Sequence, residues 1–263
     1  MASLSNKVIW ITGASSGIGE ALAIALSKKG AKLILSARRS EELERVQKLC
    51  GQAPVQLVPL DLTAADKLDV ATQSALACYG HIDVLVNNGG ISQRSYVHET
   101  GMDVFRRIME VNFFGGIALT RNLVGHFVSR NQGQFVVISS VTGKYGTPFR
   151  SGYAASKHAL HGFYDAVRAE YWKNNVKVTM VCPGVVRTPI SFSALKGDGT
   201  KNNKMDDLQS KGMPVEKCAD AIVRSIESER EEVYIGGKEV ILIYIKRFLP
   251  SLFSKIIRKV VVR

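Results

Sequence analysis

The chain has 263 residues, of which 46% are hydrophobic, and a formal net charge of +12 at pH 7. This length and apolar content suffice for a folded domain with a full core, which excludes an intrinsically disordered chain. Four cysteines stand far apart without a CxxC pair, which argues against a disulfide framework or a zinc site and favours free thiols in a reducing compartment.

The start of the chain does not resemble an export signal. Met1 is followed by a short polar stretch rather than by a basic start and an apolar run, so we expect no signal peptide. No window reaches the ~18 unbroken apolar residues that a membrane-spanning helix needs. The sequence therefore predicts a cytoplasmic protein.

Short apolar runs alternate with longer amphipathic segments. Runs such as IWIT, LILSA and FVVIS are almost continuously apolar, which is typical of parallel strands buried on both faces. Their alternation with helical patterns predicts an α/β fold, with a doubly wound parallel sheet in a single domain. Strands are expected at 8–13, 32–37, 56–60, 83–87, 134–139, 176–182 and 233–236, and helices at 18–29, 41–50, 64–79, 103–130, 152–173 and 215–228.

The first strand leads into a glycine-rich turn, VIWITGASSGIGEALA, with glycines at 13, 17 and 19. Glycine lets the backbone turn sharply and approach a phosphate closely, and the next helix offers free N–H groups to a pyrophosphate. The spacing GxxxGxG differs from the better-known GxGxxG. A simple tight turn is the alternative, but the position between a first strand and a first helix favours a dinucleotide site.

The second strand ends in SARRS. An acidic residue at this strand end favours NAD, whereas a nearby arginine accommodates the 2′-phosphate of NADP. Here Ala37 takes the acidic position, and Arg38 and Arg39 follow it. We expect Arg38 to select NADP(H); two merely solvated arginines are the alternative.

Two pairs have the pattern Tyr-x-x-x-Lys, Tyr153 with Lys157 and Tyr234 with Lys238. The second pair has two glycines between its members, so a helix is not expected to align them. The first pair lies in a good helix former, where positions i and i+4 share a face. Ser140 stands thirteen residues upstream of it, at the end of the fifth strand, where open α/β sheets bind their ligands.

Tyr153, Lys157 and Ser140 suit the reduction of a ketone. Hydride transfer creates an alkoxide that must take up a proton, and a tyrosine with a pKa near 10 is a poor donor at neutral pH. We expect the ammonium of Lys157 to lower the pKa of Tyr153 and the hydroxyl of Ser140 to hold the carbonyl oxygen. Tyr145 and Phe149 are expected to form walls of the substrate pocket, and we expect no metal.

Several motifs occur together in one order. The combination resembles the short-chain dehydrogenase/reductase family over about residues 5 to 237, and through the run PFRSGYAASKHAL it is most similar to the steroid-dehydrogenase-like and dehydrogenase/reductase branch. The motifs are TGASSGIG at 12–19, DLT at 61–63, NNGG at 87–90, Asn112, Ser140, YAASK at 153–157 and PGVVRT at 183–188.

The resemblance implies a Rossmann-type sheet of seven strands, a nicotinamide cofactor and a homodimer or homotetramer. It also implies that Tyr153 is the acid/base, that Lys157 binds the nicotinamide ribose, that Ser140 orients the substrate oxygen, and that Asn112 supports a proton relay through water. In family terms, Arg38 marks a preference for NADP(H). The cofactor-binding residues implied or expected are Gly13, Ser15, Ser16, Gly17, Ile18, Gly19, Arg38, Asp61, Leu62, Asn88, Tyr153, Lys157, Val186 and Thr188. One departure is Gly89, where the family usually has alanine; its missing methyl is expected to loosen that turn.

The end of the chain divides into two informative segments. Residues 189–212 are polar and contain glycines, which favours a mobile substrate flap within a catalytic domain at 1–237. Residues 238–263 form an apolar and basic helical tail with seven Lys or Arg and one Glu. Such a tail suits an anionic membrane surface, but packing on a neighbouring subunit or over the substrate pocket is the open alternative.

The sequence therefore predicts an NADP(H)-dependent oxidoreductase that interconverts a carbonyl and a secondary alcohol on a lipophilic substrate. A cofactor-binding sensor without turnover is one alternative, although all four catalytic residues are present. A nucleic-acid-binding protein is another because of the net charge, but no binding module accompanies that charge. The sequence does not identify the substrate.

Overall fold

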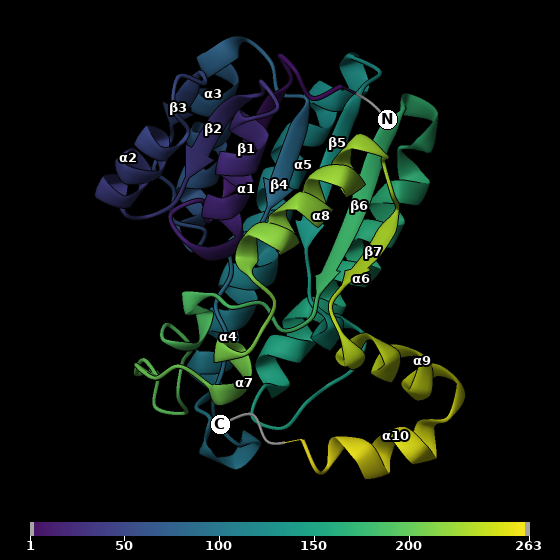
Figure 1. Cartoon of the computed structure of the whole chain (residues 1–263). Helices are drawn as coiled ribbons and strands as arrows, with labels where there is room; N and C mark the ends of the chain where they lie inside the picture. Colours follow the sequence, from purple (N-terminus) through teal and green to yellow (C-terminus); the bar gives the residue numbers. More distant parts are fainter. Residues whose placement is uncertain (1–2, 261–263) are drawn as a thin grey trace.

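The computed structural model describes residues 3–260 and contains one parallel sheet of seven strands in the order β3-β2-β1-β4-β5-β6-β7 (Figure 1). The predicted fold class is therefore confirmed. Strand β3 is shorter than expected, but backbone hydrogen bonds from Val58 to Leu35 and from Leu60 to Ala37 extend its pairing to the predicted end. The strands are β1 (Val8–Thr12), β2 (Lys32–Ser36), β3 (Val55–Leu57), β4 (Val84–Asn87), β5 (Gly133–Ile138), β6 (Val176–Pro183) and β7 (Glu232–Ile235).

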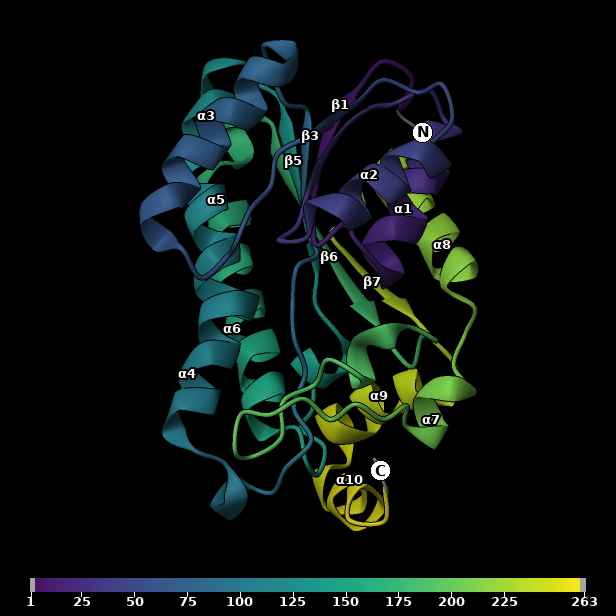
Figure 2. The ribbon, with the colours of Figure 1, turned by 90° about the vertical axis from the view of Figure 1, so that its left-hand side faces the viewer.

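Helices cover both faces of the sheet, as Figure 2 shows with the sheet almost edge-on. Helices α1, α2 and α8 lie on one face, and α3, α5 and α6 lie on the other. The helices are α1 (Gly17–Ser27), α2 (Ser40–Leu49), α3 (Leu68–Tyr79), α4 (Met102–Met109), α5 (Gly115–Ser129), α6 (Ser151–Glu170), α7 (Asp207–Ser210), α8 (Val215–Glu227), α9 (Ile241–Phe248) and α10 (Pro250–Ile257).

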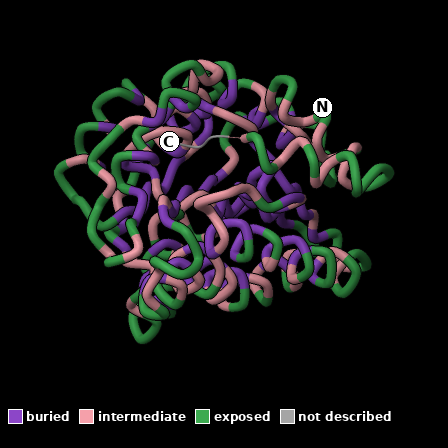
Figure 3. The backbone as a smooth tube through the Cα atoms, turned by 90° about the horizontal axis from the view of Figure 1, so that it is seen from below, coloured by how far each residue is buried: buried purple, intermediate pink, exposed green. Residues whose placement is uncertain are grey.

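Alternate residues of each strand build two separate cores. On β1, Ile9 and Ile11 pack towards α1 and α8, whereas Val8 and Trp10 pack on the opposite face. All four are fully buried, which explains why the strand has no polar alternation. Figure 3 shows buried residues through the centre of the molecule and exposed residues around its edge.

The long helix expected at 103–130 is interrupted by a π-helical segment, η3 (Glu110–Phe114), between α4 and α5. A π-helical turn inserts one extra residue into the helix and is frequent at functional sites. Asn112 lies within it and is buried. The periodicity of the sequence does not reveal this interruption, because the apolar pattern continues through it.

The C-terminal segment, residues 238–260, begins with a short turn, η7 (Lys238–Val240), and continues into α9 and α10, at the end of the molecule where the strands terminate (Figure 1). It packs on its own chain: Tyr145 donates a hydrogen bond to the carbonyl of Glu239 at 3.0 Å, and Lys246 donates one to the carbonyl of Lys144 at 2.7 Å. Within residues 3–260, no helix has the length and apolar character needed to cross a membrane.

Candidate active site

A large cavity of about 1220 Å³ opens at the carboxyl ends of the strands. Its lining contains most of the residues that the sequence singles out, drawn from the glycine turn, the ends of β2 and β4, and α6. The predicted residues in the lining are Gly13, Ser15, Ser16, Gly17, Ile18, Arg38, Asp61, Leu62, Asn88, Ser140, Tyr153, Lys157, Val186 and Thr188.

The turn after β1 has the geometry that requires glycine. Gly13 and Gly17 have φ angles of +64° and +58°, in the region where a side chain is strained. A Cβ on Gly19 would lie 2.4 Å from the carbonyl oxygen of Gly13, so no larger residue fits there. Helix α1 therefore begins close against the strand end, and its first residues, Gly17 and Ile18, line the cavity. The start of a helix is a setting that favours phosphate groups.

Asn88 holds this turn to the end of β4. Its side-chain amide donates to the carbonyls of Thr12 and Gly13 at 3.0 and 3.1 Å, and its backbone N–H donates to the Thr12 hydroxyl at 3.0 Å. The next residue, Gly89, is not loosely packed: a Cβ there would lie 2.5 Å from Cδ1 of Leu62. The leucine fills the space that a methyl group would need, contrary to the looser turn expected from the sequence.

Arg38 is exposed at the rim of the cavity, beside a smaller hollow that Asp61, Arg106 and Arg107 also line. Burial opposes the charge of Asp61, but hydrogen bonds from Thr63 and the positive charges of Arg38 and Arg107 hold its pKa below the ordinary value. Glu110 also lines the hollow, so three guanidinium groups face two carboxylates and leave an excess of positive charge, a setting suited to a phosphate group.

Tyr153, Ser140 and Lys157 come together, as expected. The hydroxyl of Ser140 lies near that of Tyr153 and opposes the rise in the pKa of the tyrosine, and the ammonium of Lys157 lies 5.7 Å from the centre of the Tyr153 ring. Lys157 also donates to the carbonyl of Ile138 at 2.8 Å. Ser140 is fixed from the other side, because its hydroxyl accepts from the N–H of Thr142 at 3.2 Å.

The expected lowering of the tyrosine pKa is wrong for the protein alone. Burial raises the pKa of Tyr153, and the opposing influences are the charge of Arg150, the hydrogen bond with Ser140 and the charge of Arg94. Burial also lowers the pKa of Lys157 to about 8, because a desolvated ammonium is unfavourable. Lys157 is thus still mostly protonated at pH 7 and loses its charge as the pH rises through about 8. Arg94 and Arg150 were not identified from the sequence as neighbours of Tyr153.

Asn112 is oriented by the loop that follows β4 and by helix α6. Its amide oxygen accepts from the N–H of Ile91 at 2.8 Å, and its amide nitrogen donates to the carbonyl of Ile91 at 2.9 Å and to the hydroxyl of Ser156 at 3.0 Å. The Ser156 hydroxyl donates to the carbonyl of Tyr153 at 2.8 Å. This chain of bonds connects the π-helical segment to the first turn of α6.

Two predicted pocket residues lie elsewhere. Tyr145 is buried against the C-terminal segment, 5.6 Å from the ring of Phe253, and does not line the cavity. Phe149 packs 4.3 Å from the ring of Tyr96 and is also absent from the lining. The sequence placed both in the loop after Ser140 but gave no indication of which way that loop runs.

The predicted flap at 189–212 does cover the cavity, with Ile190, Phe192 and Leu195 in the lining. It is more ordered than its composition predicts, because Ala194 and Leu195 are buried and Leu195 forms isolated bridges with Gln93 and Lys201. Its mobility stays a prediction.

His161 of α6 lies inside the molecule, outside the proposed catalytic set. It is buried, its Nε2 lies 3.1 Å from the hydroxyl of Ser139, and burial lowers its pKa to about 4. The ligand atoms of His161, Cys182 and Glu232 lie within 4.8 Å of one another, a spacing that could hold a metal ion. Glu232, however, already forms an ion pair with Lys144 at 2.7 Å.

Known proteins resemble this chain over most of its length. Residues 7–198 match the family described as short chain dehydrogenase. A Drosophila melanogaster protein called dehydrogenase/reductase SDR family protein 7-like is 40% identical over 263 residues, covering 97% of this chain and 81% of the relative. The human dehydrogenase/reductase SDR family member 7 is 40% identical over 256 residues, covering 94% and 76%.

Solved structures have the same fold. A short-chain dehydrogenase from Streptomyces avermitilis is 30% identical, with a TM-score of 0.82 and 96% of each chain covered. A short-chain dehydrogenase/reductase from Burkholderia phymatum, solved in complex with NAD, has a TM-score of 0.85 over 96% of each chain; at 21% identity it shows the fold alone.

Proposed function

The chain belongs to the short-chain dehydrogenase/reductase family of oxidoreductases, and we propose that it is an NADP(H)-dependent enzyme that interconverts a carbonyl and a secondary alcohol. One observation supports this most: Ser140, Tyr153 and Lys157 form one cluster in a cavity that begins at the glycine turn. Apolar lining from Ile91, Phe192 and other residues supports a lipophilic substrate.

Each residue of the cluster has a separate role in the proposed reaction. The nicotinamide cofactor, when bound, supplies the hydride. Ser140 holds the carbonyl oxygen, and Tyr153, whose raised pKa keeps it protonated, gives the proton to that oxygen. Lys157 stabilises the phenolate that remains, and Asn112 fixes the backbone of Ile91 at the edge of the cavity, where a water chain can return the proton.

A panel of carbonyl compounds tests the activity. Oxidation of NADPH, followed by absorbance, is measured with bulky apolar ketones and quinones beside small polar aldehydes. We expect turnover with members of the first group. Tight NADPH binding without turnover of any carbonyl would instead identify a cofactor-binding sensor.

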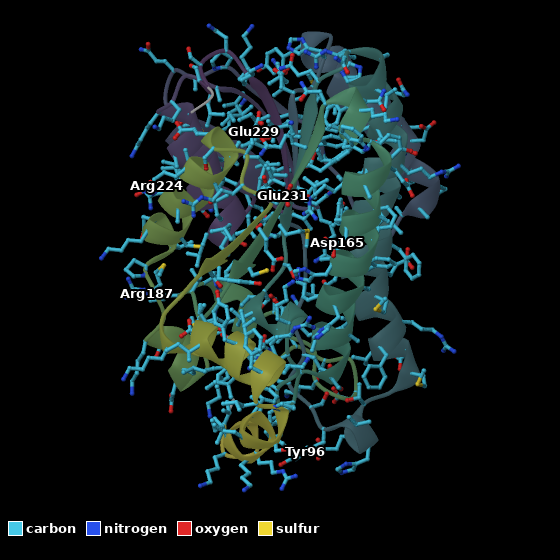
Figure 4. All side chains as sticks on the ribbon, turned by 90° about the vertical axis from the view of Figure 1, so that its right-hand side faces the viewer. Tyr96, Asp165, Arg187, Arg224, Glu229 and Glu231 are labelled. Atoms are coloured by element: carbon cyan, nitrogen blue, oxygen red, sulfur yellow. The ribbon has the colours of Figure 1, made fainter. Side chains whose placement is uncertain are left out.

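Replacement of Arg38 by aspartate is expected to shift the preference from NADPH towards NADH by at least ~10-fold in kcat/KM. The guanidinium accommodates the 2′-phosphate, whereas a carboxylate at that strand end repels it and accepts a hydrogen bond from a free 2′-hydroxyl. Steady-state kinetics with both cofactors measures the ratio. Arg224→Asp, on the exposed side of α8 (Figure 4), is the control for the change in charge. If Arg38→Asp left the ratio of kcat/KM for NADPH and NADH unchanged, Arg38 would not be the residue that selects between the two cofactors.

We further propose that the C-terminal segment binds an anionic membrane surface. None of its described residues lines the cavity, which favours the membrane over packing on the pocket, and several of its apolar side chains are exposed beside basic ones. Basic, apolar helices lie in the headgroup layer of such membranes. The exposed apolar residues are Ile241, Tyr244, Phe248, Leu249 and Leu252.

Phe248→Ser combined with Leu249→Ser is expected to abolish flotation with phosphatidylserine vesicles. Phe248 and Leu249 are 74% and 56% exposed, so the change removes apolar contact with lipid without opening the core. Vesicle flotation of the wild-type protein and of the double variant measures this loss of binding. Val70→Ser, at an exposed position of α3, is the control. Equal flotation of the wild-type protein, the double variant and Val70→Ser would contradict membrane binding through these residues and would leave a neighbouring subunit as the partner of this surface.

We also propose a homodimer or homotetramer in a reducing cytoplasm. Helices α5 and α6 lie together on one face, and Phe114 is 47% exposed at the start of α5. The four cysteines are free thiols. Sedimentation equilibrium tests the assembly, and a monomer at micromolar concentration would contradict it.

A further inference from the structure

Given the proposed reductase function, on which this step rests, we propose that the substrate carries a carboxylate besides its carbonyl and that Arg150 binds this carboxylate. The side chain of Arg150 lines the cavity within one helical turn of Tyr153. A single small molecule can therefore meet both residues. The substrate class is a lipophilic keto acid.

Arg150 has hydrogen-bonding capacity that the protein does not use. Its side chain is 14% exposed, and one terminal nitrogen lies 3.4 Å from a carboxylate oxygen of Asp206. Its Nε atom is buried without a hydrogen-bond partner among residues 3–260. A buried N–H group without a partner is costly, so the guanidinium is held in an unfavourable setting. A ligand reaches it through the terminal nitrogens, of which only one has a hydrogen-bond partner within residues 3–260.

Asp206 does not neutralise Arg150, because Arg94 already occupies it. The Nε and a terminal nitrogen of Arg94 donate to the same Asp206 oxygen at 2.8 and 2.5 Å. The remaining terminal nitrogen of Arg94 donates to Ser92 and Gln93 at 2.8 and 2.6 Å. The hydrogen-bonding groups of Arg94 are thus paired, and its bond to Asp206 anchors the segment at 189–212. This anchoring gives Arg94 and Asp206 a structural role, but it gives none to Arg150.

Two guanidinium groups share one carboxylate, so this buried cluster carries a net positive charge. Side chains of Arg94 and Asp206 are only 7% and 4% exposed, and water therefore screens the excess charge poorly. Burial and the neighbouring charge of Arg94 lower the pKa of Arg150 to about 10, which shows how unfavourable its isolated charge is. A bound carboxylate would remove this penalty and accept from the planar fork of Arg150.

Apart from Asp206, which does not line the cavity, the surrounding wall has no acidic side chain to compete for Arg150. Lining residues from 88–107, 138–157 and 183–209 include Arg94, Arg150, Lys157 and Lys201 and no Asp or Glu. The acidic residues of the lining come from other parts of the structure, namely α1, α2, the loop after β3, and α8; they are Glu20, Glu42, Asp61, Glu216 and Asp220. The charge of this half of the cavity is therefore complementary to an anion.

The test compares 4-oxo-4-phenylbutanoate and its longer homologues with the amides of the same acids, which keep the carbonyl and the carbon skeleton but lack the charge. We expect the best acid to exceed its amide by ~10-fold to 100-fold in kcat/KM, mainly through KM, because charge-assisted hydrogen bonds contribute that much. Arg150→Met should bring the ratio near one. Any effect of the lost charge on Tyr153 changes both substrates equally and cancels in the ratio.

Arg150→Lys, which keeps the charge but not the fork, should retain an intermediate preference, and Arg224→Met is the matched control for charge at an exposed site outside the cavity. Calorimetric titration of the NADPH-bound protein with 4-phenylbutanoate, which has no ketone, measures the carboxylate site without turnover. Equal kcat/KM for acids and amides, or an acid preference that survives Arg150→Met, would overturn the proposal. Absence of any carbonyl reduction, with 4-phenylbutanoate binding that disappears in Arg150→Met, would overturn the reductase function and leave the carboxylate site standing.

Discussion

Carbonyl reduction is expected to fall by about 10³-fold when Tyr153 is replaced by phenylalanine, because general-acid catalysis contributes ~10²-fold to 10⁴-fold. The hydroxyl of Tyr153 lies near that of Ser140, and the raised pKa of Tyr153 keeps the proton on the phenol until the carbonyl oxygen accepts it. Phenylalanine keeps the ring and its packing but has no proton to give. Binding of NADPH, measured by fluorescence titration, should stay nearly unchanged, so the loss appears in kcat.

Tyr234→Phe is the matched control, since Tyr234 begins the second Tyr-x-x-x-Lys sequence. Its hydroxyl interacts with Glu232 on β7 and it does not line the cavity. This variant should keep its activity. If Tyr153→Phe retained a tenth or more of the wild-type rate, another residue would have to supply the proton.

Replacement of Lys157 by alanine is expected to weaken NADPH binding and to lower kcat/KM by about 10²-fold. The ammonium lies 5.7 Å from the centre of the Tyr153 ring, where we propose that it stabilises the phenolate, and it donates to the carbonyl of Ile138 at 2.8 Å. Its removal is therefore expected to disturb both charge and geometry. The comparison with Lys238→Ala, an exposed lysine of the second sequence pair, separates this effect from a general loss of charge.

The pH profile adds a sharper test of Lys157. Its lowered pKa of about 8 means that the side chain is charged below this pH and neutral above it. The pKa of Tyr153 is raised, so Tyr153 stays protonated through the same range. Reduction should therefore decline as pH rises through about 8, and Lys157→Arg, which remains charged, should lack this decline. An identical decline in both proteins would assign it to another group.

The order and type of most elements follow from the sequence because each strand is buried on both faces. Val8 to Thr12, for example, are all buried, so the apolar run alone marks them as a strand. The interruption at Asn112 could not be predicted, since a π-helical turn shifts the register by one residue without changing the apolar pattern. The same holds for α10, whose position depends on contacts such as that between Tyr145 and Phe253.

The catalytic set could be predicted in part because helical spacing places Tyr153 and Lys157 on one face. The influence of burial on their pKa values could not, since it depends on every layer packed around them. Arg150 was visible in the sequence three residues before Tyr153, which is one helical turn. Its partner Asp206, however, lies more than fifty residues further on, and only the folded chain brings the two together.

Leu62 limits two neighbouring glycines at the mouth of the site to different degrees. A Cβ on Gly89 would lie 2.5 Å from Cδ1 of this leucine, whereas a Cβ on Gly115 would lie 2.5 Å from its carbonyl oxygen and 2.6 Å from its Cβ. Alanine at position 89 therefore displaces only the end of a flexible side chain. Alanine at position 115 would push the backbone that follows β3 away from the start of α5, so Gly115 tolerates replacement far less than Gly89 does.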